Sequence, residues 1–113
     1  MNFDIKKVKI SVTMPIDYVK RIRNVMCEEG AGIIGNYKYC SIYTKCKGTF
    51  KPSSDANPYI GEKNKLEFVE EVKLEINCDV DKVKKVINKL RDAHPYEEPV
   101  IDIIPLIDES NFK

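Results

Sequence analysis

His94, the only histidine of the chain, is the first candidate for chemistry. An imidazole transfers protons near neutral pH and binds metal ions. His94 opens the closing block His94-Pro95-Tyr96-Glu97-Glu98-Pro99, at the carboxyl end of an expected helix. The helix dipole stabilises a protonated imidazole there, typically by a few tenths to about 1 kcal/mol. His94 therefore has two interpretations, a helix-capping cation or a contact to a ligand or a neighbouring subunit.

Two pairs of adjacent glutamates, Glu70-Glu71 and Glu97-Glu98, are the next candidates. Successive side chains of an extended segment point to opposite faces, so neither pair can act as a facing acid and base. Solvation or salt bridging is the role expected for all four. Because no serine, cysteine or lysine stands visibly beside a base, the sequence predicts no catalytic residue.

The segment Gly30-Ala31-Gly32-Ile33-Ile34-Gly35 matches the G-x-G-x-x-G pattern of dinucleotide-binding turns. In those turns the glycines leave a strand and open a helix, so that backbone amides meet a pyrophosphate. Here the glycines follow a helix and lead into a strand. They predict a glycine cap and a tight connection, and a dinucleotide site is rejected. Exposed glycine amides could still form a small anion-binding concavity.

Composition and cysteine spacing exclude further kinds of site and partner. The four cysteines are 13, 6 and 32 positions apart, which matches neither a zinc site nor a redox dithiol. Nineteen Lys and Arg against eighteen Asp and Glu create no strong field toward nucleic acid or an acidic membrane. No segment resembles a signal peptide or a membrane span. We expect a cytoplasmic protein with no cofactor or metal and with neither nucleic acid nor membrane as partner.

The elements that position these residues follow from hydrophobic periodicity. Expected strands cover residues 8–13, 37–50, 66–78 and 100–104, the last ended or confined to a sheet edge by Pro105. Expected helices have buried stripes from Ile16 to Met26 and from Val80 to Leu90, with Gly30 closing the first and Asp79 capping the second. The order β-α-β-β-α-β predicts one ferredoxin-like α+β domain over residues 1–113, an antiparallel sheet with two helices on one face.

Residues 51–64 do not fit this regular plan, because fourteen residues join two strands that a hairpin would join with two to five. The segment contains Pro52, Pro58, Gly61 and the apolar pair Tyr59-Ile60. This composition predicts an ordered loop that packs on another part of the molecule.

Three blocks resemble the insertion domain of Nif-three-like proteins, over about residues 8–106. They are Gly30 to Tyr37, Gly48 to Pro52 with Ala56 to Gly61, and His94 to Pro99. In the longer bacterial members, sometimes described as a type 2 GTP cyclohydrolase I, this domain interrupts a two-lobed dinuclear-metal protein. The closing block is also similar to the end of CutA divalent-ion tolerance proteins, which share with PII regulators a trimer-forming ferredoxin-like domain.

The resemblance implies a function for this chain. The metal ligands of the family lie in the flanking lobes, so none is carried over, and we expect a free-standing, non-catalytic module. It would form a homo-oligomer, as a trimer, and bind a small ligand or a protein between subunits. The candidate ligand or interface residues are Asn36, Tyr37, Asn57, Tyr59, His94, Tyr96 and Glu97.

Two alternatives stay open at this point. One is a divalent-cation responder like CutA, in which symmetry gathers His94, cysteines and carboxylates from several subunits. The other is an enzyme acting on a nucleotide, which needs either the loop residues Asn57 and Tyr59 or His94 to line a deep pocket. The identity of the ligand does not follow from the residues.

Overall fold

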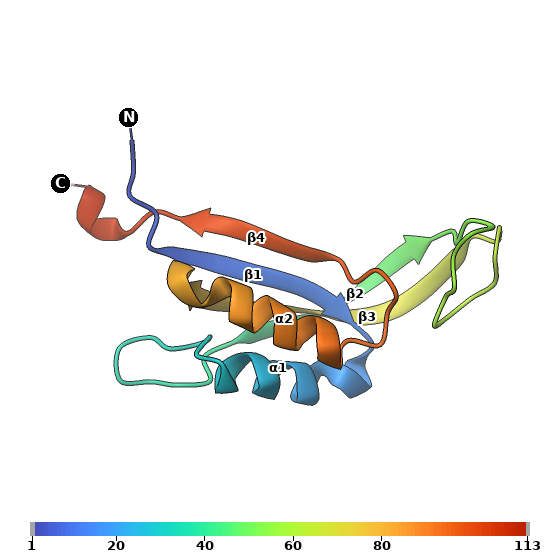
Figure 1. Cartoon of the computed structure of the whole chain (residues 1–113), viewed down its shortest axis with the longest axis horizontal. Helices are drawn as coiled ribbons and strands as arrows, with labels where there is room; N and C mark the ends of the chain where they lie inside the picture. Colours follow the sequence, from blue (N-terminus) through green and yellow to red (C-terminus); the bar gives the residue numbers. More distant parts are fainter. Residues whose placement is uncertain (1, 113) are drawn as a thin grey trace.

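The computed structural model describes residues 2–112 and has the predicted ferredoxin-like fold (Figure 1). The predicted domain of residues 1–113 also includes Met1 and Lys113, which lie outside the described residues. The strands and helices are β1 (Lys7–Met14), α1 (Val19–Glu28), β2 (Ile42–Phe50), β3 (Glu67–Asp79), α2 (Val83–Ala93) and β4 (Ile101–Leu106). Short 3-10 turns cover Ile16–Tyr18, Val80–Lys82 and Glu109–Asn111.

The four strands form one antiparallel sheet in the order β2-β3-β1-β4. Ile10 at the centre of β1 lies opposite Ile76 of β3 on one side and Ile103 of β4 on the other. Alternate residues of β1 and β3 face both helices, which cover a single face of the sheet (Figure 1). The opposite face carries Lys9 and Lys73, and no helix of residues 2–112 covers it.

The core forms between this face and the apolar stripes of the helices. Ile22 and Met26 of α1, and Val86 and Leu90 of α2, are fully buried at the helical spacing of four. The predicted burial is wrong for the outermost residue of each apolar stripe. Ile16 and Val80 lie in the 3-10 turns ahead of the α-helices, where the different winding leaves their side chains about half exposed.

The connection after α1 contains the predicted glycine cap, but the strand that follows it starts later than predicted. Gly30 has a φ of +104°, and the next amide, Ala31 N–H, donates back to the carbonyl of Met26. The strand predicted from Tyr37 begins only at Ile42. Tyr39 takes a left-handed φ of 58°, and Cys40 N–H donates to Gly32, so backbone groups expected in the sheet hold a loop instead. This loop, residues 31–41, is the α1–β2 loop below.

Asp79 does not cap the second helix as predicted. Its side chain makes no capping hydrogen bond, and its Oδ1 lies 3.2 Å from Nζ of Lys7. The reason is the sheet register, which places Asp79 at the end of β3 directly opposite Lys7. The chain then enters α2 through the turn Val80–Lys82, so the position of the cap is taken by Lys82.

The β2–β3 hairpin extends beyond the rest of the sheet. The last pair between β1 and β3 is Met14 with Val72, so Glu67 to Glu71 pair with β2 alone. Together with the joining loop, this part forms an arm that leads away from the helices (Figure 1). This hairpin arm consists of residues 46–71.

The final strand lies at the sheet edge, as the proline predicts. Pro105 is within β4, which runs from Ile101 to Leu106 and pairs with β1 alone. Within residues 2–112, no helix combines the length and apolar character required to cross a bilayer.

Candidate functional site

The loop of the hairpin arm folds back onto the closing block. The backbone N–H of Asn57 donates to both carboxylate oxygens of Glu97, at 3.0 and 3.3 Å. These residues are 40 positions apart, so the contact joins two separate segments of the chain. The loop therefore packs on another part of the molecule, as its composition predicts.

A row of aromatic rings continues this contact. The Tyr59 ring lies edge-on to Tyr18 at the start of α1, with centroids 6.4 Å apart, and 6.1 Å from Tyr96. The Tyr96 ring in turn lies 4.8 Å from His94. Aromatic pairs in such geometries contribute about 0.5–1.5 kcal/mol each beyond the area they bury. Tyr59 thus anchors the loop between the helical layer and the closing block.

His94 is a buried structural residue, only 7% exposed. Its Nε2 lies 2.8 Å from the carbonyl oxygen of Thr13, and the N–H of Tyr96 donates to its Nδ1 at 3.1 Å. A carbonyl only accepts and an amide N–H only donates, so Nε2 must carry the proton. The ring is a neutral link between the end of β1 and the closing block.

The prediction of a helix-capping cation at His94 is therefore wrong. Burial lowers the pKa of His94, and the hydrogen bond to Thr13 and the charge of Glu71 only oppose this effect. The physical reason is the backbone, which leaves α2 in an extended conformation at His94 and turns the ring against β1. Both ring nitrogens are hydrogen-bonded, so neither offers a free lone pair to a metal ion.

Glu71 is also buried, at 8% exposure, and the solvated role predicted for it is wrong. The hydroxyl of Tyr96 donates to its Oε2 at 2.8 Å. Burial, followed by this hydrogen bond to Glu71, raises the pKa of Tyr96, because a phenolate would face a carboxylate in a desolvated place. Tyr96 is therefore held in its protonated, donating form at neutral pH.

Gly48 provides the space that Glu71 occupies. A Cβ at this position would lie 2.6 Å from Oε1 of Glu71, closer than real contacts allow. In the sheet register Glu71 lies opposite Cys46, which places Gly48 diagonally across from it on the same face. A glycine inside a strand is a signal of close approach, and it is the one sequence feature that could have indicated a buried partner here.

These contacts border a half-open pocket of about 400 Å³ between the hairpin arm and the closing block. Its apolar walls include Phe50, Pro58, Tyr59, Ile60, Val69 and Val100. Its charged residues are Lys51, Glu71, Glu97 and Glu98, and Tyr96 adds a hydroxyl. Of the seven predicted site residues, Tyr59, Tyr96 and Glu97 line the pocket, while Asn57 and His94 position its lining residues from outside.

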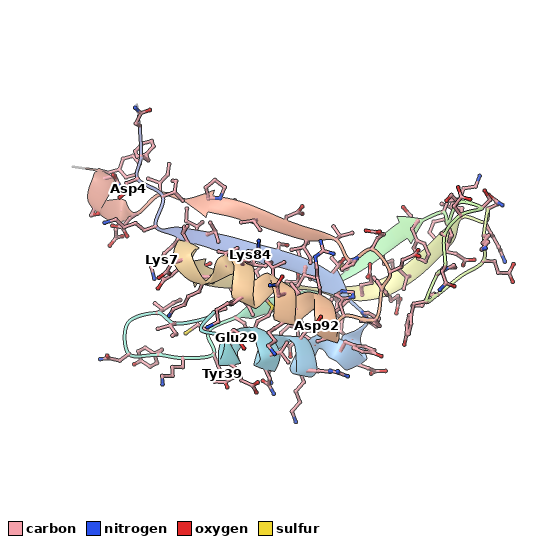
Figure 2. All side chains as sticks on the ribbon, in the orientation of Figure 1. Asp4, Lys7, Glu29, Tyr39, Lys84 and Asp92 are labelled. Carbon is pink, nitrogen blue, oxygen red and sulfur yellow. The ribbon has the colours of Figure 1, made fainter. Side chains whose placement is uncertain are left out.

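The remaining two predicted residues, Asn36 and Tyr37, lie elsewhere. Both belong to the α1–β2 loop, where Tyr37 exchanges backbone hydrogen bonds with Ile34. This loop is at the opposite end of the molecule from the hairpin arm (Figure 1), and Figure 2 labels its Tyr39 near the carboxyl end of α1. Asn36 and Tyr37 therefore do not contribute to the pocket.

Comparison with known proteins supports the resemblance found in the sequence. No family model matches the chain. It is 43% identical over 101 residues to a GTP cyclohydrolase 1 type 2 homolog of Halalkalibacterium halodurans. It is 41% identical over 98 residues to the homolog of the same name from Bacillus subtilis. These matches cover 89% and 87% of this chain but 27% and 26% of the relatives, so the chain spans about a quarter of their length.

Solved structures agree with this result. A Bacillus cereus protein related to NIF3 matches 95% of this chain with a TM-score of 0.80 and 34% identity, and 27% of that protein is covered. The divalent cation tolerance protein CutA from Archaeoglobus fulgidus matches 88% of this chain and 83% of its own, with a TM-score of 0.66 and 20% identity. At 20% identity, the similarity to CutA concerns the fold alone.

The chain is therefore a ferredoxin-like domain of the CutA architecture. In sequence it is related to a segment, about a quarter in length, of Nif-three-like proteins. The resemblance predicted from the three blocks is confirmed.

Protonation of His94 is expected to destabilise the fold. Its folded pKa is below the ordinary value of 6.5, so the unfolded chain takes up this proton first. The stabilising contribution is complete above pH 6.5 and is lost as the pH falls from there through the folded pKa. Urea unfolding between pH 7.5 and 5 should show this loss, and His94→Gln, which cannot titrate, should give a flatter profile. Parallel profiles for the two proteins would contradict the assignment.

Removal of the Tyr96 hydroxyl should cost stability. Tyr96→Phe leaves the buried Glu71 carboxylate without its donor, a loss of about 1–3 kcal/mol by the usual cost of an unmade buried hydrogen bond. Tyr37→Phe is the matched control, because Tyr37 is 76% exposed. Chemical denaturation of both variants measures the difference. Equal stability of the two variants would show that the Tyr96–Glu71 bond contributes nothing.

Proposed function

We propose that this chain is a non-catalytic binding module that assembles into a homo-oligomer and takes a small ligand in the pocket beneath the hairpin arm. The observation that carries the proposal is the contact between Asn57 and Glu97, which holds the long loop over a pocket of ligand size. Pockets of roughly 300–1,000 Å³ with apolar walls and a few fixed polar groups are typical of small-molecule sites.

The absence of catalysis is proposed from what the polar groups near the pocket already do. Both nitrogens of His94 hold the backbone, and Tyr96 is kept protonated beside Glu71. Groups that could exchange protons are thereby used for positioning. The name GTP cyclohydrolase 1 type 2 homolog belongs to relatives about four times as long, and we propose that this chain does not share a cyclohydrolase activity.

Self-association is proposed from the two free edges of the sheet. The edge strands β2 and β4 both expose large apolar residues, Ile42 and Tyr43 on one and Ile103 and Ile104 on the other. Exposed edges of this kind risk open-ended pairing unless a partner covers them. Pairing of β2 in one copy with β4 in the next joins different surfaces, and a closed ring of copies satisfies both edges. A ring of three agrees with the trimer implied by the resemblance to CutA.

The same arrangement places the pocket near a subunit junction. Phe50 at the end of β2 and Val100 just before β4 both line the pocket. A neighbouring copy that pairs along either edge therefore lies beside it. In this proposal the ligand binds at a cleft between subunits, in the reducing cytoplasm, where the cysteines Cys27, Cys40, Cys46 and Cys78 stay as free thiols.

The proposed assembly is tested by multi-angle light scattering at micromolar concentration. The expected mass is three times the 13.0 kDa of one chain. Ile104→Asp places a charge on the helix-free face of edge strand β4 and should reduce the mass to that of one chain while the helical circular dichroism signal stays unchanged. Lys84→Glu is the control, because Lys84 is an exposed residue of α2 (Figure 2). A wild-type protein that remains a monomer would overturn the proposed assembly.

A further inference from the structure

We infer that the pocket selects a small organic cation, an amine on an aromatic or aliphatic body, over neutral and anionic molecules of the same shape. This inference rests on the proposed function, since it assumes that the pocket is a ligand site. It assigns the chemical class of the ligand.

The charge of the pocket is the first reason. Three carboxylates, those of Glu71, Glu97 and Glu98, line the pocket against one ammonium group, that of Lys51. The whole chain carries a net charge of +1, so the pocket differs in sign from the molecule around it. A concave site with an excess of one charge concentrates ligands of the opposite charge.

The four charges act with different strength because their side chains differ in burial. Lys51, Glu97 and Glu98 are exposed, and water and salt screen their fields. Glu71 is 8% exposed, so its charge acts in a medium of lower dielectric constant. The dominant charge of the pocket is therefore the negative charge of Glu71.

The hydrogen bonding of Glu71 is the second reason. Its Oε2 accepts from the Tyr96 hydroxyl, whereas no hydrogen bond within residues 2–112 goes to its Oε1, which lies above Gly48. No fully buried side-chain oxygen of these residues lacks a partner, so Oε1 reaches solvent. A carboxylate is an acceptor only, so a ligand group that replaces solvent at Oε1 must be a donor. An ammonium group provides up to three N–H donors and a compensating charge.

The aromatic lining is the third reason. The rings of Phe50, Tyr59 and Tyr96 line the same pocket as Glu71. The face of an aromatic ring attracts a cation, and an aromatic or aliphatic ligand body packs against such rings equally well. Val69 and Val100 extend the apolar wall. An amine with an apolar body therefore satisfies both kinds of lining at once.

Three probes that share a phenylethyl body and differ in their polar group test this inference by calorimetric titration of the intact protein. Phenethylamine carries the cation, 2-phenylethanol is its neutral analogue, and 3-phenylpropionate carries an anion. The expected order of affinity is phenethylamine first, by about tenfold or more over 2-phenylethanol, since charge-assisted hydrogen bonds are roughly twice as strong as neutral ones. The anion should bind most weakly. Amide chemical shift changes at Tyr59, Val69 and Tyr96 should locate the bound amine.

Glu71→Gln removes the charge and keeps the shape, so phenethylamine should lose about tenfold in affinity while 2-phenylethanol is unchanged. Glu70→Gln is the matched control, because Glu70 is the neighbouring residue of β3 and does not line this pocket. Its affinities should equal those of the wild type. If Glu71→Gln fails to fold, Glu98→Gln replaces it, with a smaller loss expected for an exposed charge.

The outcomes separate the inference from the proposed function. Equal binding of all three probes, or tighter binding of 3-phenylpropionate, overturns the cation preference and leaves the pocket as a ligand site. Binding of phenethylamine that Glu71→Gln does not weaken also overturns it. If none of the probes binds at millimolar concentration, both the cation preference and the ligand site are wrong.

Discussion

The partly buried hydrogen bond between Tyr96 and Glu71 is the interaction on which the candidate site depends. It fixes the closing block against β3 at the point where the hairpin arm leaves the core, and Gly48 is the residue that leaves room for it. His94 holds the same block to the end of β1. With the block held from two sides, Glu97 accepts a hydrogen bond from the amide of Asn57, and the long loop forms one wall of the pocket.

This arrangement separates two tasks within a small domain. The layer of helices on one face of the sheet supplies the hydrophobic core and the stability that comes from burial. The hairpin arm and the closing block extend past that core and form the pocket. The edge strands adjoin the pocket at Phe50 and Val100, so assembly and ligand binding are expected to influence each other through the same few residues.

The fold could be predicted because its signals are local. Val8, Ile10 and Val12 alternate with polar residues, and Ile22 and Met26 recur at helical spacing, so burial of one face can be read along the chain. The site depends on contacts between distant segments. The burial of Glu71 depends on Gly48 across the sheet and on Tyr96 after the second helix, and His94 loses its expected charge because its ring reaches β1. The neighbours of Asp79 in sequence predict a helix cap, whereas its partner is Lys7 across the sheet.

In the proposed assembly, the pocket between the hairpin arm and the closing block is a ligand site at a junction between copies of this chain. A crystal structure of the assembled protein grown with phenethylamine tests it most directly. We expect an amine nitrogen within hydrogen-bond distance of the Glu71 carboxylate, with an edge strand of a neighbouring copy beside Phe50 or Val100. A pocket that stays empty while the copies associate through a different surface would contradict it.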